Sequence, residues 1–201
     1  MLEDIAGVAH EPDGTPVGAV ALTHGAGGNR DSPMLVAICT EWARRGWLAV
    51  RYNLPYRRRR PKGPPSGAGH DLAGVVEAVR AVAAMVDGPV IAGGHSYGGR
   101  LTSMAAADGL QPDVLTLFSY PLHPPGKPER ARVEHLPRIT APTVFTHGTA
   151  DPFGTIDELR AAAALISTAE IVEITGARHD LGSKKLDVPV LAVDAALRLL
   201  R

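Results

Sequence analysis

The stretch Gly93-Gly94-His95-Ser96-Tyr97-Gly98-Gly99 follows a short apolar segment that starts at Val90, and a helical pattern begins at Arg100. Within it, Gly94-x-Ser96-x-Gly98 is the pattern of a strained strand-to-helix turn that presents a serine hydroxyl. The residues flanking the serine must be small, because a side chain at 94 or 98 would clash within so tight a turn. The sequence therefore predicts a serine hydroxyl held at the carboxyl end of a strand.

On both sides of this turn, short apolar runs alternate with longer segments that have the period of a helix. The strands are expected at Val17–Thr23, Leu48–Asn53, Val90–Gly94, Val114–Tyr120, Thr143–His147 and Glu170–Ile174. The helices are expected at 33–45, 70–86, 96–107, 157–167 and 187–200. Several strands are apolar on both faces, as central parallel strands are when helices cover both sides of a sheet. The alternation predicts an α/β fold with a doubly wound, mostly parallel sheet, and the residues before Gly14 are expected to add an antiparallel edge strand.

Two segments interrupt this alternation, Pro55–Gly69 and Pro121–Pro137, and both are rich in proline. Both are predicted to be loops of one domain spanning residues 1–201, since neither separates two independent cores and no room is left for a large cap domain. The first contains the run Arg57–Arg60. Runs of like charge usually face water, so a solvated loop is expected, with a basic lip for an acidic substrate or partner as the alternative.

Composition excludes several classes of protein. The chain has 201 residues, 45% apolar and 21% charged, and its 21 lysines and arginines balance 21 aspartates and glutamates. That balance argues against binding to nucleic acid or to an anionic membrane. Cys39 has no partner for an internal disulfide, which suits a reducing compartment. The first residues are acidic rather than basic, and no apolar run reaches the roughly 20 residues of a membrane span. A cytoplasmic protein is expected.

A serine hydroxyl becomes a useful nucleophile only when a base takes its proton and a third group orients that base. On a fold of this kind the partners follow in the order serine, acid, histidine. Asp151 and His179 come in that order after Ser96, each in a short loop just past a predicted strand. The carboxyl ends of parallel strands share one edge of the sheet, so these three side chains are expected to meet there. Asp180 is a weaker alternative acid, because a residue adjacent to His179 cannot easily reach its ring nitrogen.

Acyl transfer also needs donors for the oxyanion of the tetrahedral intermediate. The N–H of Tyr97, directly after the serine, is expected to be one donor. The glycine-rich loop His24-Gly25-Ala26-Gly27-Gly28 is expected to supply the other, from Ala26 first and Gly27 second. Losing one such donor typically costs about 3–4 kcal/mol of transition-state stabilisation. His24 is expected to support this loop.

Further residues are expected to contact substrate. They are Gly27, Tyr56, His123 and Phe153. The tyrosine and phenylalanine would form apolar walls, and the histidine would line the pocket from the second proline-rich loop.

Five blocks of sequence together resemble a known family. They are His24–Gly28, Tyr52–Tyr56, Gly94–Arg100, Ser119–Lys127 and Gly148–Gly154. In this order they are similar to the small α/β-hydrolase group that includes testis-expressed protein 30 and the hydrolase-like domain of an NSL complex subunit. The resemblance implies a minimal α/β-hydrolase fold without a large cap, a Ser-His-Asp site on Ser96, His179 and Asp151, and no metal or organic cofactor. Dienelactone hydrolases are more distant relatives that use a cysteine, whereas this chain has serine at the turn.

The expected activity is hydrolysis of small, accessible esters or thioesters through an acyl-enzyme intermediate on Ser96. The partner would be a small-molecule ester-type substrate, because no lid or specificity domain is expected. The alternative is a binding or scaffold protein that keeps the fold without turnover, since fold alone does not determine function. Haloalkane dehalogenation is set aside, because that chemistry requires a carboxylate at the turn.

Overall fold

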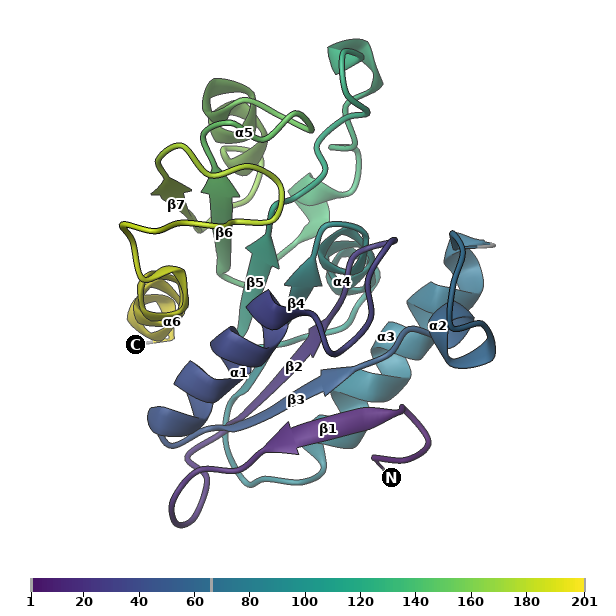
Figure 1. Cartoon of the computed structure of the whole chain (residues 1–201), viewed down its shortest axis with the longest axis vertical. Coiled ribbons are helices and arrows are strands. Elements are labelled where there is room, and N and C mark those ends of the chain that lie inside the picture. The colour runs from purple at the N-terminus through teal and green to yellow at the C-terminus, as the bar shows by residue number, and fades with distance from the viewer. Residues whose placement is uncertain (1, 66, 201) are drawn as a thin grey trace.

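A computed structural model describes residues 2–65 and 67–200. Its centre is a seven-stranded sheet in the order β1-β3-β2-β4-β5-β6-β7 (Figure 1). The strands are β1 (Gly7–His10), β2 (Ala19–Thr23), β3 (Leu48–Tyr52), β4 (Val90–His95), β5 (Val114–Phe118), β6 (Thr143–Gly148) and β7 (Ala169–Ile174). β1 pairs antiparallel with β3, and every other neighbouring pair is parallel. The predicted mostly parallel sheet and its antiparallel edge strand are confirmed.

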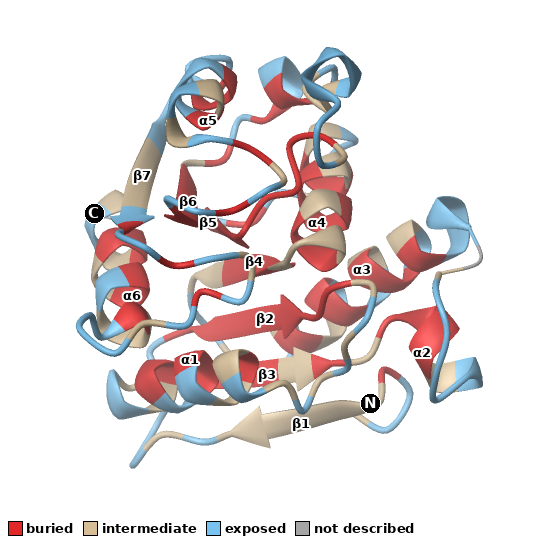
Figure 2. Cartoon of the chain, turned by 45° about the horizontal axis from the view of Figure 1, so that its top comes forward, coloured by how far each residue is buried: buried red, intermediate tan, exposed pale blue. Residues whose placement is uncertain are grey.

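Helices cover both faces of this sheet, as Figures 1 and 2 show. The helices are α1 (Pro33–Arg44), α2 (Pro55–Arg59), α3 (Ala68–Ala83), α4 (Tyr97–Ala107), α5 (Ile156–Ala163) and α6 (Val188–Leu199). Helices α1 and α6 pack together on one face, and α3 and α4 pack together on the other. Two short 3₁₀ turns, η1 (Pro128–Arg130) and η2 (Leu136–Arg138), follow β5. The doubly wound prediction is therefore confirmed.

The hydrophobic core is divided into two parts by the sheet. Along β2, Ala19 and Ala21 belong to one core while Val20 and Leu22 belong to the other, because successive side chains of a strand point to opposite faces. All five residues of β2 are buried (Figure 2). The centre of the sheet is thus a rigid base, and the loops at its carboxyl edge are held in place by it.

The segment Pro55–Gly69 differs from the prediction of a loop. Its first five residues form α2, with Pro55 at the first helical turn, where the missing proline N–H needs no partner. Arg57 is buried, so the expectation that the whole arginine run faces water is wrong at this residue. In the described part of the chain, no helix combines the length and the apolar character that crossing a bilayer requires.

Candidate active site

The turn between β4 and α4 consists of Ser96, whose backbone has φ 49° and ψ −115°. A non-glycine residue held in this region costs about 1–3 kcal/mol, which the surrounding structure must supply. A Cβ atom on Gly94 would lie 2.6 Å from the Thr23 carbonyl oxygen, and one on Gly98 would lie 2.6 Å from the His24 carbonyl oxygen. The backbone approaches so closely on both sides that only glycine fits at these two positions.

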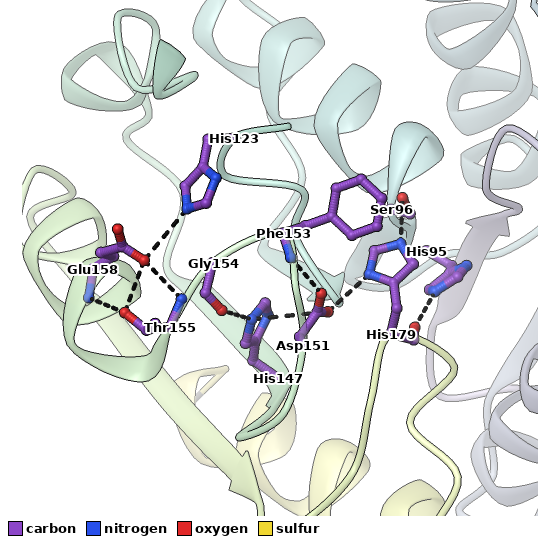
Figure 3. Close-up of polar contacts among 10 residues, drawn as sticks. All are labelled: His95, Ser96, His123, His147, Asp151, Phe153, Gly154, Thr155, Glu158 and His179. Atoms are coloured by element: carbon purple, nitrogen blue, oxygen red, sulfur yellow. Dashed lines mark hydrogen bonds and ion pairs between the residues drawn. The ribbon is translucent and has the colours of Figure 1, made fainter. Parts of the chain in front are cut away.

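Three segments bring a hydroxyl, an imidazole and a carboxylate together at the carboxyl edge of the sheet (Figure 3). Ser96 Oγ lies 2.8 Å from His179 Nε2, and His179 Nδ1 lies 2.8 Å from Asp151 Oδ2. The Ser96 hydroxyl can donate a hydrogen bond to Nε2 only in the tautomer that carries its proton on Nδ1. In that tautomer Nδ1–H donates a hydrogen bond to the Asp151 carboxylate. The Asp180 carboxylate instead accepts from the N–H of Gly182 in its own loop.

The Asp151 carboxylate is held in its ionised form. The residue is buried, with 5% of its surface exposed, and burial by itself would raise its pKa. The hydrogen bonds from His179 and from the Phe153 N–H, at 2.9 Å, outweigh burial and leave the pKa below its ordinary value. A carboxylate that stays charged at neutral pH stabilises a positive imidazolium on its neighbour.

His179 is fixed from two further directions that the sequence did not indicate. His95 Nε2–H donates to the His179 carbonyl oxygen at 2.8 Å, and burial lowers the pKa of His95, which keeps it neutral. The Phe153 ring lies against the imidazole, with 4.3 Å between ring centroids. The backbone and the ring of His179 are therefore both held, which limits the orientations that its Nε2 can take.

The loop Gly25–Gly28 after β2 lies beside the serine. A Cβ atom on Gly25 would lie 3.3 Å from Ser96 Cβ. On the other side of the serine, Tyr97 is the first residue of α4, so its N–H has no acceptor four residues earlier in the helix. The two backbone segments expected to donate to an oxyanion thus flank the hydroxyl.

The carbonyl groups of this loop are bound on the side of α2. Arg57 Nε donates to the Gly28 oxygen at 2.8 Å, and Arg57 Nη2 donates to the Ala26 oxygen at 3.2 Å. The Tyr56 hydroxyl lies 2.7 Å from the same Ala26 oxygen and 3.3 Å from the Gly25 oxygen. In a trans peptide the N–H points opposite to the carbonyl. Fixing these oxygens toward α2 therefore directs the N–H groups of Ala26 and Gly27 away from it.

Tyr56 and His123 were both expected to contact substrate, but they lie elsewhere in the structure. Tyr56 is buried behind the glycine-rich loop, and its N–H donates to Asp71 Oδ1 at 3.0 Å. His123 lies next to Glu158, at 3.3 Å, apart from the serine (Figure 3). Neither is among the described residues that line the cavity over Ser96. The structure therefore does not place them at the cavity, where they were expected to contact substrate.

A cavity of about 1390 Å³ opens over the serine. Its walls include the predicted residues Ala26, Gly27, Tyr97, Phe153 and His179. No group of three or more histidine, cysteine, aspartate or glutamate side chains among residues 2–65 and 67–200 is arranged to hold a metal ion.

The chain matches a known protein family and shares its fold with solved structures. The family model described as alpha/beta hydrolase domain matches residues 16–189. The protein Est1E from Butyrivibrio proteoclasticus superposes with a TM-score of 0.75 at 16% identity, covering 96% of this chain and 92% of that one. A lidless α/β serine hydrolase, XC6422 from Xanthomonas campestris, superposes with a TM-score of 0.72 at 19% identity, covering 96% and 88%.

A dienelactone hydrolase from Anabaena variabilis also superposes, with a TM-score of 0.72 at 22% identity over 95% of this chain and 88% of that one. At these identities the structures establish a shared fold. The family match covers most of the chain, and it includes the turn at Ser96 and the loops that carry Asp151 and His179. This chain belongs to the α/β-hydrolase family.

Proposed function

We propose that this protein is a serine hydrolase that cleaves small esters or thioesters through an acyl-enzyme intermediate on Ser96. The observation that carries the proposal is the unbroken series of contacts Ser96 Oγ–His179 Nε2 and His179 Nδ1–Asp151 Oδ2, each 2.8 Å long. A nucleophile in contact with a base, which is in contact with an orienting carboxylate, is the arrangement that acyl transfer requires.

In the first half of the reaction, Ser96 Oγ attacks the carbonyl carbon while His179 Nε2 takes the hydroxyl proton. The oxyanion that forms accepts hydrogen bonds from the N–H groups of Tyr97 and Ala26. The bond from carbon to the leaving oxygen or sulfur then breaks, and the imidazolium gives its proton to the leaving group. Asp151 stabilises the imidazolium during this step.

In the second half, water replaces the leaving group. His179 removes a proton from that water as its oxygen attacks the acyl carbon, and the same donors hold the second oxyanion. The ester bond to Ser96 breaks, the proton returns to Oγ, and the free acid leaves. The open cavity favours short, accessible acyl groups over long lipids.

The decisive experiment compares Ser96→Ala with the wild type on p-nitrophenyl esters of graded chain length. Removal of the nucleophile should lower turnover by about 10⁶-fold. The exposed Ser167 provides a matched control, and Ser167→Ala should retain full activity. A fluorophosphonate should label the wild type on Ser96. Labelling that persists in Ser96→Ala would refute the proposal, and a wild type that neither turns over nor reacts would favour a binding protein.

Asp151→Asn tests the orienting carboxylate separately. An amide at this position favours the wrong tautomer of His179, so kcat should fall by about 10⁴-fold while the fold is retained. Circular dichroism would verify the fold. A variant with wild-type kcat would show that Asp151 has no part in the reaction.

We also infer that the chain belongs to the small group that includes testis-expressed protein 30. The support is the five sequence blocks from His24–Gly28 to Gly148–Gly154. Three of these blocks supply residues that hold the glycine-rich loop or the base, namely Tyr56 for the loop and His95 and Asp151 for His179.

A further inference from the structure

Two arginines that the sequence analysis did not select lie in the wall of the cavity over Ser96. They are Arg100, on α4, and Arg132, in the loop between η1 and η2. The arginine run that suggested a basic lip is elsewhere, since Arg57 binds loop carbonyls and Arg58–Arg60 are not among the described lining residues. Positive charge therefore reaches the cavity from a different part of the chain.

Arg100 is one helical turn after the serine, and its N–H donates to the Ser96 carbonyl oxygen at 2.9 Å. Its side chain lines the same cavity as the serine hydroxyl. Its Nε is buried and has no hydrogen-bond partner among the described residues. Its guanidinium forms no ion pair with a carboxylate in the described part of the chain. A buried donor without an acceptor is costly, and a ligand that supplied one would recover that cost.

Arg132 is held firmly where it enters the wall. Its Nη1 donates to the Pro121 oxygen at 2.8 Å, its N–H donates to the Leu122 oxygen at 2.8 Å, and the Tyr120 hydroxyl donates to its carbonyl at 2.7 Å. Burial, followed by the charge of Arg100, lowers the pKa of Arg132. Both arginines line the same cavity, and no carboxylate of the described residues forms an ion pair with either.

The other charged residues in the cavity wall do not neutralise the positive charge of the two arginines. They are Asp180, Lys184, Lys185 and Asp187, two of each sign, and all belong to one exposed loop. A largely apolar cavity with two partly buried arginines, neither of them in an ion pair with a carboxylate of the described residues, is suited to an anion, since guanidinium groups bind carboxylate or phosphate oxygens through paired N–H donors.

We infer that Arg100 and Arg132 form an anion-binding subsite, and that the substrate is an ester or thioester whose acyl or leaving part carries a carboxylate or phosphate group. This inference rests on the proposed hydrolysis at Ser96. The anionic group would pair with the arginines while the scissile carbonyl lies at the serine hydroxyl, so the subsite would select the substrate and orient it.

The test uses p-nitrophenyl hemiesters of succinate, glutarate and adipate, each paired with its uncharged methyl ester. The measured quantity is the ratio of kcat/KM for the anionic ester to kcat/KM for its neutral partner. We expect the wild type to favour at least one anionic ester by about tenfold or more, and Arg100→Gln and Arg132→Gln to lower that ratio by about 10- to 100-fold. Arg59→Gln removes one charge from exposed surface outside the cavity and should leave the ratio unchanged.

A second arm identifies the anionic group. Glutarate and inorganic phosphate are compared as competitive inhibitors of neutral ester hydrolysis, and the stronger inhibitor indicates whether carboxylate or phosphate is preferred. Stoichiometric labelling of Ser96 by an uncharged fluorophosphonate verifies that each variant is folded. Hydrolysis of neutral esters with no anionic preference and no effect of Arg100→Gln would overturn this inference alone. Failure to hydrolyse any ester, charged or neutral, would overturn the proposed function.

Discussion

Acidification should destabilise this protein through His24, the histidine that opens the glycine-rich loop. Its Nδ1–H donates to the Gly25 oxygen at 2.8 Å, and its Nε2 accepts from the Leu54 N–H at 3.2 Å. The contact with Leu54 requires the neutral ring, because a second proton on Nε2 would face the Leu54 N–H, whereas Nδ1–H can donate to the Gly25 oxygen in either charge state. Burial, the largest effect, lowers the pKa of His24 from 6.5 to about 4.

The sign and size of the effect follow from linkage between protonation and folding. Well above pH 6.5 the ring is neutral in both folded and unfolded chains, so the stability it provides is fully present. As the pH falls below that value, the unfolded chain takes up a proton that the folded protein excludes, until the folded pKa near 4 is reached. Between about pH 7.5 and about pH 5, this difference should remove about 2 kcal/mol from the free energy of unfolding.

The assay is urea unfolding at both pH values for wild type, His24→Gln and the control His70→Gln, which removes an exposed histidine. The free energy of unfolding of the wild type should fall by about 2 kcal/mol more than that of His24→Gln, while His70→Gln should follow the wild type. Equal pH dependence in wild type and His24→Gln, or an NMR titration of His24 near its ordinary pKa, would refute the reasoning.

Three further outcomes follow from the structure. Arg57→Lys keeps the charge but loses the guanidinium fork that binds two loop carbonyls, so kcat should fall about 10- to 100-fold relative to Arg59→Lys; an unchanged kcat would contradict the role given to Arg57. Gly93→Ala would place a Cβ 1.9 Å from the Thr116 oxygen and should cost about 3 kcal/mol or more in urea unfolding, whereas Gly69→Ala, with open space around it, should not destabilise. Burial raises the pKa of Cys39 to about 12, so iodoacetamide should modify it only after unfolding; rapid labelling of the native protein would show that the helix opens.

Local patterns in the sequence were sufficient for the sheet, its helices and the three polar side chains at its edge. The six parallel strands and the five longer helices follow from apolar periodicity, which depends only on nearby residues. Ser96, Asp151 and His179 were selected because each follows a strand, and parallel strands place their carboxyl ends along one edge. These patterns involve residues that are close together in the sequence, so a single sequence is enough to recognise them.

Residues whose importance depends on distant backbone could not be selected in this way. Arg57 and Arg59 are the same residue type, two positions apart, yet Arg57 is buried against loop carbonyls about 30 residues away in sequence and Arg59 is exposed. His95 binds a carbonyl 84 positions later, and Arg132 reaches the cavity from a proline-rich segment without regular period. Only the packed structure shows which oxygen atoms face these donors.

The backbone conformation of Ser96 lowers the stability of the fold at the residue that carries the hydroxyl. The turn keeps an L-amino acid at φ 49°, a conformation that glycine adopts freely, so the molecule tolerates an unfavourable local state at the position that carries the hydroxyl. A glycine there would relieve this strain but would remove the hydroxyl that lies beside His179. The strain is therefore the local cost of placing a hydroxyl at the carboxyl end of β4.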